Sequence, residues 1–148
     1  MRRQPRAPDE PLLAGRLLLW SLLQGAVAFA LVASIYVIAQ DRAMPEAEAR
    51  ALAFFSLVTA IVALILVNRS FSASILSALR RPNRALVYVL LVVAAILAAS
   101  LMSPWLSGLF RFGPLHAGDL VLAVAAGAGL LGVLEVMKPL WRLQARER

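Results

Sequence analysis

Residues 51–84, ALAFFSLVTAIVALILVNRSFSASILSALRRPNR, contain the segment that decides the fold. Its first part, 51–68, carries no charge. As a helix it would be about 27 Å long, close to the ~30 Å hydrocarbon core of a bilayer. The run ends at Arg69, and Arg80, Arg81 and Arg84 follow in the next connection. Because cytoplasmic loops carry an excess of Lys and Arg, the pattern predicts a transmembrane helix that ends inside the cell.

Three further apolar runs surround this segment, one before it and two after it. Together they predict an all-α, polytopic membrane protein with spans at about 17–40, 51–68, 85–103 and 119–137. Since the spans alternate in direction, both termini are expected in the cytoplasm. The predicted layout is a cytoplasmic Pro/Arg-rich lead-in at 1–16, a four-helix transmembrane domain at 17–138 and a cytoplasmic basic tail at 139–148. The connection 103–118, rich in proline, glycine and aromatic residues, is expected to be a short interfacial loop on the outer surface.

Composition supports the membrane assignment. Hydrophobic residues make up 61% of the chain and the mean hydropathy is +0.81, both outside the range of soluble globular proteins. The net charge of +7 arises from arginines that flank the apolar runs, and the predicted layout places most of the 15 basic residues inside. We therefore expect an integral protein of the plasma (inner) membrane with the lipid bilayer as its surroundings and no nucleic-acid partner.

The residues that enzymes and metal sites need are missing from the sequence. The chain has no cysteine and one histidine, His116, and it lacks a glycine-rich phosphate loop and paired carboxylates on a helix face. The polar residues deepest in the spans are uncharged, and interhelical or backbone hydrogen bonds account for them. These residues are Gln24, Ser34, Ser56 and Thr59. The sequence predicts no catalytic residue, cofactor site or metal site.

Small residues recur four positions apart in three of the spans, as Ala95 and Ala99 do in the third, and such faces let membrane helices approach closely. The candidate packing residues are Ala26, Ala30 and Ser34 in the first span, and Ala125 with Gly129 and Ala128 with Gly132 in the fourth. Alanine is abundant throughout the chain, so composition alone is an equally good explanation of the pattern. Glu135 and Lys138, three residues apart on one helix, are expected to form an ion pair that anchors the end of the fourth span.

Four landmarks occur in order along the chain. The lead-in shows an M-x-R-x-P-R-x-P-x-E-P-L pattern from Met1 to Leu12. It is followed by LVTAIVALILVNRS, then PWLSGLFRFGPLHAGDL, then the E-x-x-K formed by Glu135 and Lys138. These landmarks resemble transmembrane helices seven to ten, the C-terminal membrane region, of P-type cation-transporting ATPases of the calcium- and sodium-pump type.

The resemblance implies a structural role and no ATPase activity for this chain on its own. In that family the phosphorylated aspartate lies in a large cytoplasmic domain, and most cation ligands lie on helices four to six. Calcium pumps take one acidic ligand from helix eight, and the corresponding residue here is Ile61, which cannot coordinate a cation. Met1 matches a methionine internal to full-length pumps. We therefore expect a fragment or split subunit whose partner is the N-terminal part of a pump, with helices one to six and the cytoplasmic domains.

Two alternatives remain open at this point. An independent accessory subunit could regulate a pump by binding it through the small-residue faces. A small multidrug-type exporter has a similar length and helix number. Such exporters require an acidic residue inside the first helix for proton exchange, and 17–40 contains none, which counts against that alternative.

Overall fold

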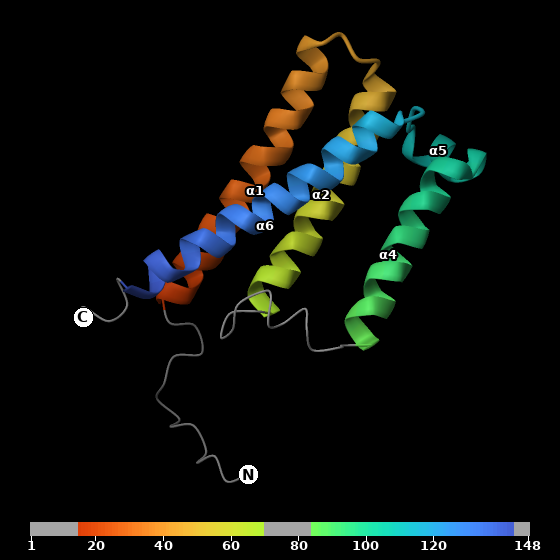
Figure 1. The fold of residues 1–148 in the computed structure, drawn as a ribbon. Coiled ribbons are helices and arrows are strands. Elements are labelled where there is room, and N and C mark those ends of the chain that lie inside the picture. The colour runs from red at the N-terminus through yellow and green to blue at the C-terminus, as the bar shows by residue number, and fades with distance from the viewer. Residues whose placement is uncertain (1–14, 70–83, 144–148) are drawn as a thin grey trace.

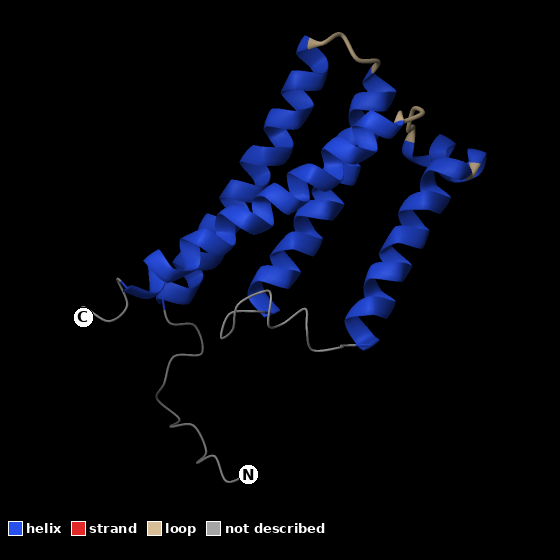
Figure 2. Cartoon of the chain, in the orientation of Figure 1, coloured by secondary structure: helices blue, strands red, loops and turns tan. Residues whose placement is uncertain are grey.

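A computed structural model describes residues 15–69 and 84–143. These residues form five helices and no strand (Figure 2). The helices are α1 (Gly15–Asp41), α2 (Glu46–Arg69), α4 (Arg84–Met102), α5 (Pro104–Phe110) and α6 (Ala117–Leu143). All but α5 contain a stretch long and apolar enough to span a membrane. The prediction of an all-α protein with four transmembrane helices is therefore confirmed. The expected lead-in up to residue 14, the connection at 70–83 and the last five residues lie outside the described part of the chain.

Several helix ends differ from the apolar runs for local reasons. Helix α2 begins at Glu46, five residues before the uncharged run, because Glu46 and Glu48 fall in its first turn, where acidic side chains interact favourably with the helix dipole. Helix α6 begins after His116, and the Asp119 carboxylate accepts a hydrogen bond from the His116 backbone N–H at 3.0 Å. This contact is one half of a capping box.

Residues 104–110 form a short helix, α5, where the sequence led us to expect a loop. Pro104 stands in the first turn, where its fixed φ angle and missing N–H suit a helix start. The helix ends at Arg111, whose φ of 53° places it in the left-handed region. The backbone N–H of Arg111 then returns to the Gly108 carbonyl.

Helices α1, α2 and α6 form the packed part of the bundle, and α6 crosses α1 and α2 at an angle (Figure 1). Buried side chains from these three helices gather in two clusters along the bundle. Helix α4 makes extensive contact only with α5, although its Leu97 and Leu101 reach the second cluster. The described chain is thus a three-helix bundle with a fourth helix at its side.

The two ends of the bundle differ in charge. The start of α1, the end of α2, the start of α4 and the end of α6 lie together at one end, and α5 lies at the other (Figure 1). The first, here named the basic end, holds Arg69, Arg84 and Lys138. The opposite α5 end holds four of the five acidic residues in the described part of the chain, together with three arginines. Its acidic residues are Asp41, Glu46, Glu48 and Asp119.

Candidate functional site

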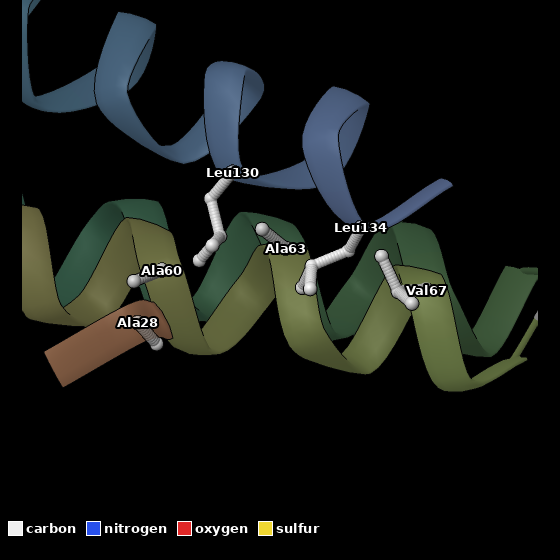
Figure 3. Close-up of a cluster of buried hydrophobic side chains, with 6 residues drawn as sticks. All are labelled: Ala28, Ala60, Ala63, Val67, Leu130 and Leu134. Carbon is white, nitrogen blue, oxygen red and sulfur yellow. The ribbon is translucent and has the colours of Figure 1, made fainter. Parts of the chain in front are cut away.

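The most closely packed part of the molecule is the crossing of α2 and α6. Helix α2 buries mostly small side chains there, and α6 buries Ala123, Leu130 and Leu134. Figure 3 shows Leu130 and Leu134 extending from α6 toward α2, where Ala60, Ala63 and Val67 lie. Ala28 of α1 completes this cluster. Small residues on α2 therefore make room for leucines of α6.

The two helices approach closely at Gly127. A Cβ atom added to Gly127 would be 2.8 Å from the Thr59 Cβ and 3.0 Å from the Thr59 carbonyl oxygen. One turn earlier on α6, the Ala123 carbonyl oxygen accepts a hydrogen bond from the Thr59 hydroxyl at 2.8 Å. The same hydroxyl lies 2.9 Å from the Ser56 carbonyl oxygen. Gly127 thus allows α2 and α6 to approach closely, and the Thr59 hydroxyl joins the two helices by a hydrogen bond in the apolar interior.

Replacing Thr59 with valine tests the hydrogen bond to Ala123. The change keeps the shape of the side chain but removes the donor. We expect a loss of about 0.6 kcal/mol in unfolding free energy, the average for an interhelical hydrogen bond in a membrane protein. SDS-induced unfolding in mixed micelles would measure it. Thr59→Ser keeps the hydroxyl and serves as the control, and a Thr59→Val variant as stable as the original chain would contradict the prediction.

The small residues predicted from sequence to mediate helix packing lie on the outside of the described bundle. Ala26, Ala30, Ser34, Ala125, Ala128, Gly129 and Gly132 are all exposed. The Ser34 hydroxyl donates to the Ala30 carbonyl of its own helix at 2.7 Å. A Cβ added at Gly129 or Gly132 would meet nothing within 4 Å. The structure therefore leaves these residues exposed among the described helices, and their packing role stays a prediction.

The residues that do pack tightly, Ala123 and Gly127, were not predicted from the sequence. They share the four-residue spacing of the exposed pairs on the same helix, so spacing alone does not distinguish them. The distinguishing signal lies on the other helix. Thr59 is a polar side chain in an apolar span, and its hydroxyl donates to the Ala123 carbonyl of α6 as well as to the Ser56 carbonyl of its own helix.

Three phenylalanine rings pack against one another at the α5 end of the bundle. The Phe54 ring centroid lies 6.1 Å from that of Phe110 and 5.1 Å from that of Phe112, which in turn are 5.3 Å apart. The backbone N–H of Gly113 donates to the Ala47 carbonyl at 2.9 Å. These contacts attach the segment after α5 to the first turns of α2, which fixes where α6 begins.

Gly113→Ala tests this attachment. A Cβ at Gly113 would be 2.8 Å from both the Glu48 Cγ and the Glu48 backbone nitrogen, so the segment must move away from α2. We expect a loss of about 1 kcal/mol in unfolding free energy, at the lower end for overpacking because a connecting segment can shift. Gly108→Ala is the matched control, because a Cβ there meets nothing within 4 Å. Equal stability of the two variants in SDS unfolding would disprove the attachment.

Glu135 and Lys138 lie at the basic end of α6, with 2.7 Å between the Glu135 Oε2 and the Lys138 Nζ. Lys138 is only 5% exposed, whereas the Glu135 side chain is 27% exposed. An ammonium group so far removed from solvent requires a compensating charge nearby. The Glu135 carboxylate therefore compensates the charge of the buried Lys138 ammonium group at the end of the last span.

Within residues 15–69 and 84–143, no group of three or more His, Asp or Glu side chains could hold a metal ion. Ile61 is 46% exposed on α2. Gln24 and Ser56 are buried, and the Gln24 Nε2 and Ser56 Oγ atoms find no hydrogen-bond partner in the described part of the chain.

Comparison with known proteins gives one match. The family model described as cation transporting ATPase, C-terminus, matches residues 1–140, which is nearly the whole chain. No curated protein and no solved structure matches the chain.

Proposed function

The chain belongs to the cation-transporting ATPase C-terminus family, and from this membership we propose that it is the helix-support part of a P-type cation ATPase. The phosphorylation machinery of such a pump lies outside its helix-support part. The partner of the helix-support part is then the part of the pump with the first six membrane helices and the cytoplasmic domains. The family match over residues 1–140 supports the assignment as the helix-support part.

The charge difference between the two ends supports an orientation for this part. The basic end holds Arg69, Arg84 and Lys138, and the start of α1 and the end of α6 add Arg16 and Arg142, against Arg42, Arg50 and Arg111 at the α5 end. Under the positive-inside rule we propose that the basic end faces the cytoplasm and that both termini lie there, in the plasma membrane.

The exposed small residues support association with further helices. In lipid there is no hydrophobic force that drives helices together, so association depends on close van der Waals packing. The faces with Ala26 and Ala30 on α1, and with Ala125 and Gly129 on α6, are open in the described chain. Their small side chains permit close packing against further transmembrane helices.

Affinity purification of the tagged full chain from its native membrane tests the proposal. We expect a polypeptide with the phosphorylation aspartate and the first six helices to co-purify in equal amount. Recovery of the chain alone would contradict the proposal. Recovery of a complete pump that already has its own C-terminal helices would instead identify an accessory subunit.

A pair of glycine variants makes this test specific. Gly129→Leu and Gly118→Leu both add a side chain where a Cβ meets nothing within 4 Å, so both should leave the isolated chain folded. Only Gly129 lies on the small-residue face. We expect Gly129→Leu to reduce co-purification and Gly118→Leu to leave it unchanged. Equal recovery with both variants would argue against this face as the contact.

A further inference from the structure

The exposed apolar surface of α4 continues beyond the end of that helix. On α4 it includes Val92, Ile96 and Met102, which are 56%, 61% and 82% exposed. On α5 it continues with Trp105 and Leu109, which are 74% and 62% exposed. Because α4 is a membrane span, its exposed apolar side chains lie in surroundings as apolar as themselves. The lipid-facing surface of α4 therefore leads directly onto α5.

The length of α4 places α5 at the level of the lipid headgroups. Helix α4 has 19 residues, so it is about 28 Å long, close to the ~30 Å hydrocarbon core of a bilayer. It begins with Arg84 at the basic end, so Met102 lies near the opposite boundary of the core. Ser103 is extended, with φ of −88° and ψ of 116°, and α5 then turns away from the direction of α4 (Figure 1). Helix α5 therefore lies at that boundary.

Another side of α5 is already in contact with protein. The Phe110 ring stacks on those of Phe54 and Phe112, at centroid distances of 6.1 Å and 5.3 Å. Trp105 and Leu109 are four residues apart, so they share one face of the helix. Their high exposure shows that this face does not point into the bundle. The face formed by Trp105 and Leu109 is here named the open face of α5.

A cation follows the open face. Arg111 comes directly after α5 and is exposed. Within residues 15–69 and 84–143 its guanidinium forms no ion pair, whereas Arg50 at the same end pairs with Glu46 at 2.6 Å. Lipid headgroups carry phosphate, which guanidinium groups bind through paired hydrogen bonds. An apolar face with tryptophan beside a basic side chain matches the two layers of the membrane interface.

The size of the surface favours lipid over a protein partner. An aromatic side chain buries about 150–250 Å². Even if Met102, Trp105 and Leu109 each buried the upper value, the total would be roughly 750 Å². Leucine and methionine are smaller than tryptophan, so the true area is lower. Each partner in a standard protein interface contributes about 800 Å². A protein that covered the open face would therefore also have to cover part of the exposed side of α4.

We propose that α5 is an interfacial anchor. Trp105 and Leu109 insert among the headgroups and upper acyl chains of the leaflet at the α5 end, and the Arg111 guanidinium binds lipid phosphate. The segment after Arg111 returns to water, where the His116 side chain is 80% exposed. Because α4 makes extensive contact only with α5, the anchor also holds the end of α4 at the membrane boundary.

Spin-label accessibility of the full chain in phosphatidylcholine vesicles tests the proposal. The chain has no cysteine, so one introduced cysteine carries the nitroxide label. The Leu109→Cys label should be more accessible to oxygen, which partitions into lipid, than to a water-soluble nickel complex. Val92→Cys gives the lipid reference and His116→Cys the water reference. A Leu109 label with the accessibility ratio of the His116 label would overturn the proposal, and so would a label that protein shields from both reagents.

Leu109→Asp gives an independent readout through the fluorescence of Trp105. A charge on the open face should draw α5 toward water, so Trp105 emission shifts to longer wavelength and its quenching by phospholipids brominated near the headgroup falls. The Trp105 signal is the difference from the same chain with Trp105→Phe. His116→Asp adds the same carboxylate to the segment expected in water and should leave both quantities unchanged. Equal effects of Leu109→Asp and His116→Asp would contradict the insertion of α5.

Discussion

Gly127→Ala is expected to destabilise the bundle, although alanine is the better helix former by about 1 kcal/mol in water. The added Cβ would stand 2.8 Å from the Thr59 Cβ and 3.0 Å from the Thr59 carbonyl oxygen. Because one of these atoms belongs to the backbone of α2, a side-chain rotation cannot relieve the contact. The two helices must separate, which stretches the hydrogen bond from Thr59 to Ala123. We expect a loss of about 1–3 kcal/mol, the range for overpacked interiors.

SDS-induced unfolding in mixed micelles, followed by tryptophan fluorescence, measures this effect. Gly129→Ala, two residues along the same helix, is the matched control because its Cβ meets nothing within 4 Å. That variant should be as stable as the original chain or slightly more stable. If Gly127→Ala and Gly129→Ala had the same unfolding free energy, α2 and α6 would not cross as closely as described.

The four spans could be predicted from the sequence because one property defines them. Residues 51–68 are uncharged over a length that matches the bilayer, and hydropathy detects that directly. The start of α2 at Glu46 was missed because its first turn projects beyond the apolar run and is stabilised by Glu46 and Glu48. Helix α5 was missed because proline and glycine dominate a segment whose Pro104 in fact favours a helix start.

The packing faces could not be predicted in the same way. In a soluble protein the buried face of a helix is apolar and the exposed face polar, but in lipid both faces are apolar. Helix α2 buries Ala60 and Ala63 and exposes Ile61 and Ile65, so size separates its faces. Helix α6 buries Ala123 and Leu130 and exposes Gly129, so size does not separate its faces. Spacing of small residues therefore indicates capacity for close packing without indicating which face the chain itself uses.

Glu135→Gln is expected to be the most destabilising change at the basic end of the bundle. Lys138 is 5% exposed, and its ammonium group lies 2.7 Å from the Glu135 carboxylate. The amide that replaces the carboxylate carries no charge, so the buried ammonium loses that compensation. Breaking a buried ion pair by removing one charge costs about 3–5 kcal/mol in soluble proteins. We expect roughly 3 kcal/mol here, measured by SDS unfolding, because the span ends near the headgroups, where the long lysine side chain can reach water.

Removing the charge of Lys138 is expected to cost less unfolding free energy than removing that of Glu135, and this difference is the more specific test of the ion pair. Lys138→Met removes the buried charge and leaves Glu135, whose side chain is 27% exposed and can be solvated in part. In the double variant, Glu135→Gln with Lys138→Met, neither charge remains, so its stability should exceed that of Glu135→Gln alone. Replacing a buried ion pair with neutral groups of similar volume is often close to neutral. A double variant no more stable than Glu135→Gln would contradict the prediction, because it would show that Lys138 without the Glu135 carboxylate carries no cost of burial.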